Sequence, residues 1–184
     1  QSTGLINFYV NGGGATRVTS ATGAIKLNQW HHLAVVRSGS TVTAYINGVS
    51  QGTVTYSGTY GLTNQAIGVG GNVAGGDTTS GYISGVRLIN GTALYSGSTF
   101  TPPTAPPTAV SGTQLLLNMT NAAITDATAK NDLQTVGNAQ ISTTQSKFGG
   151  SSIYFDGSGD YLTLPATNTT ALGSSDFTIE LWFY

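Results

Sequence analysis

The stretch NQWHHLAVVR at residues 28–37, followed by TVTAYING at residues 41–48, decides how this chain folds. Apolar and polar residues alternate in both segments, which is the two-residue period of half-buried β-strands. Residues 38–40 (Ser-Gly-Ser) favour a tight turn between them, and the closing Asn47-Gly48 pair favours a second turn with positive φ. The stretch therefore predicts two antiparallel strands joined by a hairpin.

Strand patterns recur along the rest of the chain at intervals of about ten residues, the spacing of sandwiches and barrels. Glycine-rich connections at residues 11–14 and 70–77 fit turns that need positive φ. The best helix candidate, residues 120–130, is interrupted by β-branched residues, Asn and Asp, which favours a loop or a short strand. Strands are expected over residues 4–10, 16–20, 31–38, 41–47, 49–55, 65–69, 81–89, 114–117, 133–136, 151–155, 161–164 and 177–184.

Two further segments carry a family resemblance. Together with residues 28–48, the segments FGGSSIYFDGSGDYL (residues 148–162) and DFTIELWFY (residues 176–184) resemble the laminin-G-like, concanavalin A-like jelly rolls. The branch resembled is common in viral and bacterial surface proteins. The resemblance implies an all-β fold, an antiparallel jelly-roll β-sandwich.

These segments occur in a different order from the one that is usual in that family. In its members a segment like residues 148–162 usually opens the domain, whereas here it follows the WHHLAVVR stretch. The sequence also starts without Met and stops inside a strand pattern, and an unpaired apolar strand is an aggregation hazard. We therefore expect one period of a longer tandem array, or a circularly permuted unit.

Four of the five prolines lie in residues 100–108 (FTPPTAPPT), and each removes a backbone donor, so this run is expected to be extended and outside any central strand. In tandem members of the family a stretch of this kind closes one unit, which places a boundary near residue 110. Residues 1–110 then form the C-terminal part of a jelly roll and residues 111–184 the N-terminal part. The second part is expected to fold back onto the first, to belong to the next repeat, or to donate strands to a neighbouring subunit.

Composition narrows the class of protein. Charged residues make up 7% of the chain, against about 25% in ordinary domains. With a net charge of −1 and scattered basic residues, the chain has no electrostatic footprint for nucleic acid. No apolar run approaches the roughly 20 residues of a membrane-spanning helix, and without cysteine there is no disulfide. Neutral, Thr- and Ser-rich β proteins are common outside cells and on virions, so we expect an extracellular or virion-surface location.

The alternation also predicts a core. Trp30 and Trp182 lie in strongly patterned strands and are expected to be buried, because large aromatic side chains dominate sandwich cores. One set of apolar residues, Ile153, Phe155, Leu162, Phe177, Ile179 and Leu181, is expected to pack opposite a second set, Leu33, Val35, Tyr45, Ile46, Val86 and Leu88.

Catalysis is not expected. Glucan-cleaving relatives of the fold place carboxylates at alternate positions of one strand, so that both project from one face. Here the only glutamate is Glu180, and its alternating neighbours are Thr178 and Trp182. A glycosidase needs a second carboxylate that this strand lacks.

We expect structural roles for the other charged and titratable side chains of the patterned strands. His31 and His32 are adjacent, point to opposite faces and cannot chelate one metal ion together. One is expected to be half-buried and the other solvated. Arg37 and Arg87, in otherwise apolar strands, are expected to cover an edge or to pair with an Asp.

Calcium is the cofactor to consider, because domains of the resembled type often bind it through Asp, Asn and loop carbonyl oxygens. The candidate ligands are Asp156 and Asp160 in DGSGD, and Asp77 in the glycine-rich loop. Many relatives have an acidic residue after Gly-Tyr-Ile, whereas this chain has Ser84. The alternative is that Asp156 and Asp160 fix a tight turn by bonding their own backbone.

Carbohydrate binding needs exposed aromatic faces for sugar rings and amide or carboxylate groups for hydroxyls. Tyr56 and Tyr60 lie in a turn-rich segment and are the first candidates, with Tyr95 and Asn72 as further ones.

Two functions therefore stay open. The first is a non-enzymatic structural repeat of an extracellular filament or virion appendage, such as a phage fibre or decoration protein, that contacts copies of itself or neighbouring repeats. The alternative is a sugar-binding adhesin or lectin-like module, which the fold resemblance suggests.

Overall fold

The hairpin that the alternating pattern predicts is present in the computed structural model. Its strands are His31–Ser38 and Thr41–Ile46, and the next turn has φ angles of 50° at Asn47 and 77° at Gly48. A Cβ on Gly48 would collide with the backbone carbonyl of Phe100, so this position needs glycine for space as well as for its φ.

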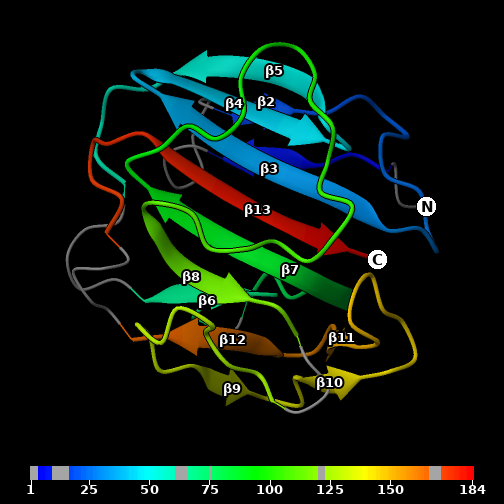
Figure 1. Cartoon of the computed structure of the whole chain (residues 1–184). Coiled ribbons are helices and arrows are strands. Elements are labelled where there is room, and N and C mark those ends of the chain that lie inside the picture. Colours follow the sequence, from blue (N-terminus) through cyan, green and yellow to red (C-terminus); the bar gives the residue numbers. More distant parts are fainter. Residues whose placement is uncertain (1–3, 10–16, 61–65, 75, 120–122, 166–170) are drawn as a thin grey trace.

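The structure describes residues 4–9, 17–60, 66–74, 76–119, 123–165 and 171–184 (Figure 1). These residues contain strands, turns and loops and no helix. The described part of the chain accordingly holds no helix that could cross a membrane. The turn predicted at residues 11–14, and the strand ends predicted at residues 10, 16 and 65, lie outside the described residues.

The described strands follow the predicted ones closely. They are, in chain order, β1 (Asn7–Tyr9), β2 (Arg17–Thr19), β3 (His31–Ser38), β4 (Thr41–Ile46), β5 (Val49–Thr55), β6 (Ile67–Val69), β7 (Ser80–Asn90), β8 (Thr113–Leu117), β9 (Gln134–Val136), β10 (Gln140–Ser142), β11 (Ser152–Asp156), β12 (Tyr161–Leu164) and β13 (Phe177–Phe183). The predicted bounds of β3, β5 and β12 are confirmed to the residue. The short strand β10 was not predicted.

A large antiparallel sheet has the order β10-β11-β7-β13-β3-β4-β5, with β8 pairing on β7 as an eighth strand (Figure 1). The C-terminal strand β13 lies at its centre, hydrogen-bonded to β3 on one edge and to β7 on the other. The parts 1–110 and 111–184 therefore contribute to one sheet. The choice between closure within one chain and strand exchange with a neighbour stays a prediction.

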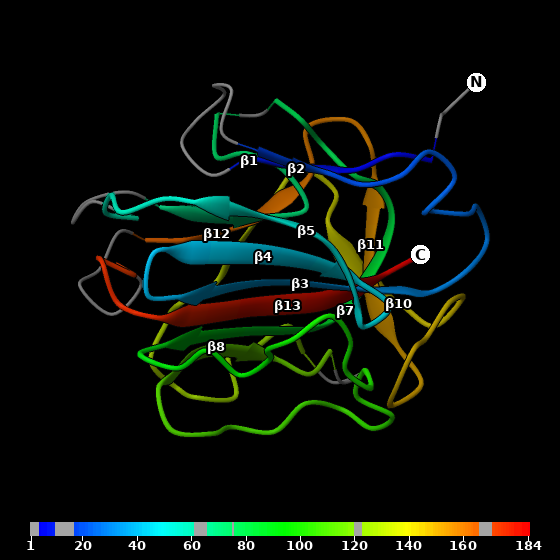
Figure 2. The ribbon, with the colours of Figure 1, turned by 90° about the horizontal axis from the view of Figure 1, so that it is seen from above.

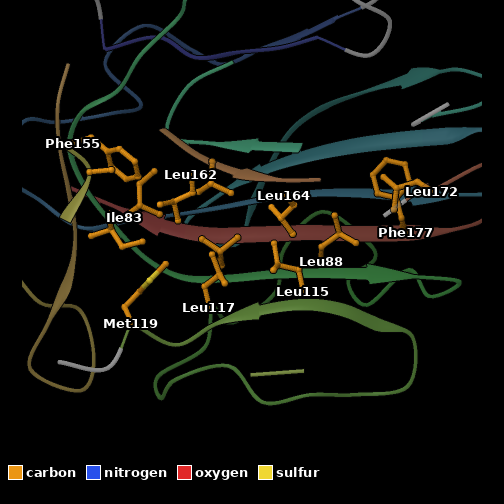
Figure 3. Packing of buried hydrophobic residues seen from close by; sticks show 14 residues of the cluster. Ile83, Leu88, Leu115, Leu117, Met119, Phe155, Leu162, Leu164, Leu172 and Phe177 are labelled. Carbon is orange, nitrogen blue, oxygen red and sulfur yellow. The ribbon is translucent and has the colours of Figure 1, made fainter. Parts of the chain in front are cut away.

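A second layer covers the inner face of this sheet. It consists of the small sheet β6-β12-β9 and the separate ribbon β1-β2 (Figure 2). Between the small sheet and the strands β7, β8, β11 and β13 lies the main core, in which Phe155 and Leu162 are fully buried (Figure 3). The two layers are the antiparallel sandwich that the sequence predicts.

The core differs from the prediction in two ways. Most of the two predicted sets lie side by side in the large sheet rather than in facing layers; Leu162, on β12, is the member that lies across. The prediction for Tyr45 is wrong: this side chain packs with Ala34 and Val36 in a second cluster on the outer face. Alternation explains it, because Tyr45 pairs with Ala34 while its neighbour Ala44 pairs with Val35.

The outer face is covered by residues 91–110, which include the proline-rich run (Figure 2). The Phe100 amide donates to the Gly48 carbonyl at 2.8 Å, and the Tyr45 hydroxyl donates to the Gly97 carbonyl at 3.1 Å. Tyr95 and Phe100 stack on each other with ring centroids 3.7 Å apart. The run expected to be an extended connection is therefore packed against the sheet.

Candidate functional site

Four aromatic rings gather at the end of the sandwich where β3 begins and β13 ends. Trp30 contacts Tyr184 with centroids 5.5 Å apart, Tyr184 contacts Tyr82 at 6.0 Å, and Tyr82 contacts Tyr154 at 5.1 Å. All four residues are half-buried, Trp30 among them, so the prediction that Trp30 is buried is wrong. We refer to these four residues as the aromatic rim.

A cavity of about 390 Å³ lies beside the aromatic rim. Tyr82, Tyr154 and Tyr184 line it together with polar side chains. The polar residues of the lining are Lys26, Asn28, Thr79 and Ser80. An apolar wall with a few converging polar groups is the usual composition of a small-molecule site.

His31 holds the loop that brings Lys26 to this cavity. The Asn47 amide nitrogen, which can only donate, lies 3.0 Å from His31 Nδ1, so this ring nitrogen accepts. His31 Nε2 lies 3.1 Å from both the backbone amide nitrogen and the carbonyl oxygen of Lys26. His31 is a positioning residue for the loop, and the same Asn47 fixes the backbone by accepting from the His32 amide.

A second cluster, the buried network, lies on the outer face and consists of Glu180, Arg87, His32 and Tyr95. Glu180 is 1% exposed. It accepts from the Tyr95 hydroxyl at 2.6 Å, from His32 Nε2 at 3.0 Å and from Arg87 Nε at 2.5 Å. Arg87 also forms a salt bridge with Glu180 and donates to the Thr108 carbonyl at 2.7 Å.

The network holds a charge inside the protein. Burial by itself would raise the pKa of the Glu180 carboxyl, but hydrogen bonds from His32 and Tyr95 and the charge of Arg87 lower it below its ordinary value. Burial, together with the bond to Glu180, raises the pKa of Tyr95. An ionised, fully paired carboxylate with no exposed face can tie segment 91–110 to the sheet, and it has no access to a substrate.

These contacts correct two predictions. Both His31 and His32 are buried, at 4% and 1% exposure, because each ring has a hydrogen-bond partner inside the protein. Arg87 pairs with a glutamate rather than with an aspartate. Arg37 instead donates to the backbone carbonyls of Gly39 and Gly58 and is buried.

Tyr56 and Tyr60 lie together, with ring centroids 4.8 Å apart. They follow β5, which ends beside the turn between β3 and β4 and therefore at the end of the sandwich opposite the aromatic rim (Figure 1). Tyr60 packs edge-on against Phe177 of the core, and its hydroxyl is buried without a partner. Burial raises the pKa of Tyr60 to about 12, so the hydroxyl keeps its proton at ordinary pH. One ring of the pair thus contributes to the interior.

The other predicted sugar ligands lie apart from this pair. Tyr95 belongs to the buried network and stacks on Phe100. Asn72 accepts from the amides of Ala74 and Gly76 and donates to Asp77 at 3.1 Å. The structure therefore does not bring the four predicted residues together.

The three candidate calcium ligands have partners in the protein. Asp160 is 1% exposed, and its two carboxylate oxygens accept from the Asn138 and Asp156 amides at 2.6 and 2.8 Å. Asp156 accepts from Asn138 and Ser158, which lowers its pKa. In the described part of the chain no three His, Asp or Glu side chains gather as a metal site would require.

Sequence reasoning missed the aromatic rim, although a signal was present. Tyr154 stands between Ile153 and Phe155, which were both predicted to be buried, so alternation places its ring on the other side of the strand. Tyr82 likewise precedes buried Ile83 and pairs with Tyr154 across the strands. The signal in the sequence was an aromatic residue at a strand position whose side chain faces away from the core.

Comparisons with known proteins identify the family of this chain. A search of curated proteins and a search of solved structures each gave no significant match. A family model described as the concanavalin A-like lectin/glucanases superfamily, of laminin-G type, matches residues 1–95. Because this match spans just over half of the 184 residues and the fold is an antiparallel sandwich, the chain belongs to the concanavalin A-like lectin/glucanase superfamily.

Proposed function

We propose that this domain is a non-catalytic carbohydrate-binding module that holds a sugar against the aromatic rim. The observation that carries the proposal is the rim itself: four half-open rings beside a cavity of about 390 Å³ with amide, ammonium and hydroxyl groups at its edge. The superfamily fits a structural or a carbohydrate-binding module, and its laminin-G-like members are typically extracellular.

The chemistry of the rim suits a sugar ring. A pyranose presents C–H groups on one face and hydroxyls around its edge, so it needs an aromatic surface and hydrogen-bonding groups at the same place. The rings of Tyr82, Tyr154 and Tyr184 offer the surface, while Lys26 and Asn28 offer donors and an acceptor. Among the described residues that line the cavity, Lys26 is the one cationic side chain, which favours a neutral sugar or one with a single acidic group.

The state of Glu180 supports binding without catalysis. Hydrolysis of a glycosidic bond needs two carboxyl groups that flank the bond. Glu180 is buried and fully paired with Arg87, His32 and Tyr95, and domains of this superfamily are generally non-catalytic binding modules.

The test is titration with a panel of neutral and acidic oligosaccharides, followed by the fluorescence of Trp30, which contacts Tyr184 in the rim. We expect at least one sugar to bind to the wild-type protein. Replacement Tyr184→Ala should weaken this binding about tenfold, since an aromatic contact contributes about 1.4 kcal/mol.

The matched control is Tyr56→Ala, which removes a half-buried tyrosine at the opposite end of the sandwich. It should leave the affinity unchanged. If Tyr56→Ala weakens binding and Tyr184→Ala does not, the sugar binds at the tyrosines that the sequence first suggested. If no sugar in the panel binds, the proposal fails.

A second role, as a structural repeat of an extracellular filament or virion appendage, is favoured by the place of β13. This strand is hydrogen-bonded along both edges, to β3 and to β7. A β13 supplied by a neighbouring copy would make the same bonds, which is the condition for strand exchange. Assembly of this kind is compatible with sugar binding at the rim.

Light scattering over a range of concentrations tests the assembly role. Oligomers that grow with concentration support it. A monomer at every concentration means that the parts 1–110 and 111–184 close on each other within one chain, and it overturns the assembly role.

A further inference from the structure

The cavity beside the aromatic rim has a charge pattern that narrows the class of sugar it can take. Lys26 is the one charged residue among the described residues that line it. All seven Asp and Glu residues of the protein lie in the described part of the chain, and none of them lines the cavity. The residues outside the described ranges contain no Asp or Glu, so they cannot supply Lys26 with a side-chain carboxylate.

Lys26 differs from the other described cations, because its side chain makes no polar contact within the protein. The structure describes five cationic side chains: Lys26, Arg37, Arg87, Lys130 and Lys147. The two arginines are held by the carbonyl and carboxylate oxygens given above. Lys130 donates to the Thr113 carbonyl at 2.6 Å, and the Lys147 ammonium lies 3.8 Å from the centre of the Trp182 ring. The Lys26 side chain is exposed and has no hydrogen bond or ion pair within the described residues.

The backbone of Lys26 is fixed although its side chain is exposed. Its amide nitrogen and its carbonyl oxygen both lie 3.1 Å from Nε2 of the buried His31. The Ile25 amide donates to the Gly4 carbonyl at 3.0 Å, and Asn28 takes a φ of 59° in the turn that follows. Because this backbone is already ordered, a ligand that binds to the ammonium group orders only one side chain, which keeps the entropic cost of binding low.

Two carboxylates close to the lining in the fold limit the number of acidic groups that a ligand can carry. Ser80 of the lining pairs across the strands with Asp156 on β11, and Asp77 lies in the loop that precedes β7. Asp156 keeps its negative charge, because hydrogen bonds from Asn138 and Ser158 lower its pKa. The whole chain has a net charge of −1. A polyanion laid along the rim would meet these negative charges, whereas a single carboxylate can bind at Lys26 alone.

We propose that the cavity binds a sugar with a single carboxylate, of the hexuronic acid type, and that Lys26 determines this preference. The ammonium group pairs with the carboxylate, the sugar ring lies against the tyrosines of the aromatic rim, and its hydroxyls bond to Thr79 and Ser80. An ammonium group has three donors and a full charge, which a carboxylate satisfies better than a hydroxyl does. The inference rests on the carbohydrate-binding role proposed above and names the substrate class of that site.

The test takes the oligosaccharide of the panel that binds most tightly, in two forms that differ only at carbon 6 of the terminal residue. One form has a carboxylate there and the other a hydroxymethyl group. Isothermal titration calorimetry measures the affinity of each form for the wild-type protein. We expect the carboxylate form to bind about fivefold more tightly at low salt, as an exposed ion pair would produce, and the difference to shrink at about 0.5 M salt. Equal affinities overturn the inference and leave the carbohydrate-binding role intact, whereas a panel in which no sugar binds overturns both.

Two matched variants assign the preference to one side chain. Lys26→Gln removes the ammonium group at the cavity, and Lys130→Gln removes one at an exposed position outside the cavity lining. Lys26→Gln should bind the two forms alike, while Lys130→Gln should keep the preference of the wild type. A preference that survives Lys26→Gln overturns the inference. A highly sulfated oligosaccharide should bind no more tightly than the carboxylate form, and tighter binding would indicate a site for polyanions and would overturn the inference as well.

Discussion

The two faces of the large sheet are stabilised in different ways. The inner face packs apolar side chains against the small sheet, with Phe155 and Leu162 fully excluded from water. The outer face carries an ionised carboxylate, an arginine and a histidine, all covered by segment 91–110. The strand β13 contributes to both faces, because its side chains alternate: Ile179 points inward and Glu180 points outward. The inner face depends on close packing, whereas the outer face depends on the ion pair and the hydrogen bonds that Glu180 accepts.

The largest expected effect is on the inner face. Phe155→Ala removes a fully buried ring from the main core and should lower the free energy of unfolding by about 3–5 kcal/mol. Phe183→Ala, at a half-buried residue packed against the same core, should cost clearly less. Urea unfolding of both variants measures the difference. Equal losses would show that the two positions are packed equally well.

The next effect is on the outer face. Glu180→Gln removes the charge that pairs with Arg87 and should lower the free energy of unfolding by about 3 kcal/mol, because it leaves a buried guanidinium without its counter-charge. Asp132→Asn removes the same charge at an exposed position and should change little. Urea unfolding of both variants compares them. A loss as small as that of Asp132→Asn would mean that water reaches the network.

The fold could be predicted well from the sequence because its signals are local. The period of two in residues 31–38 and the Asn47-Gly48 pair determine strands and turns within a few residues of each other. The strand β10 was missed because Gln140–Ser142 is too short to show a period. Tyr45 was assigned to the wrong face because adjacent Tyr45 and Ile46 are both apolar, and only the register with β3 separates them.

The candidate sites could be predicted less well because their residues are distant in the sequence. Glu180 meets His32 across 148 residues and Arg87 across 93. Such pairs cannot be recognised from residue spacing, because the partners are far apart in the sequence. Only the sheet order, with β13 between β3 and β7, brings the three together. Tyr82 and Tyr154 meet in the same way, through the pairing of β7 with β11.

Lowering the pH distinguishes the two faces, because the buried carboxyl of Glu180 lies on the outer one. The folded state holds the pKa of Glu180 below its ordinary value of 4.5, so it binds fewer protons at this carboxyl than the unfolded state does. The network therefore stabilises the fold above about pH 4.5, and this contribution is lost as the pH falls through the folded-state pKa. Urea unfolding of the wild type and Glu180→Gln from pH 7 to pH 3 should show their difference narrowing. A constant difference would contradict the lowered pKa of Glu180.

The smallest expected effect concerns calcium. Both carboxylate oxygens of Asp160 already accept backbone amides, so the turn that carries Asp156 and Asp160 is held without an ion. Addition of EDTA should leave the thermal midpoint of unfolding unchanged, with Asp160→Asn as a positive control that weakens the turn. Neither face of the sheet then depends on a metal. A fall of several degrees with EDTA, reversed by added calcium, would instead support the hypothesis that Asp156, Asp160 or Asp77 binds calcium.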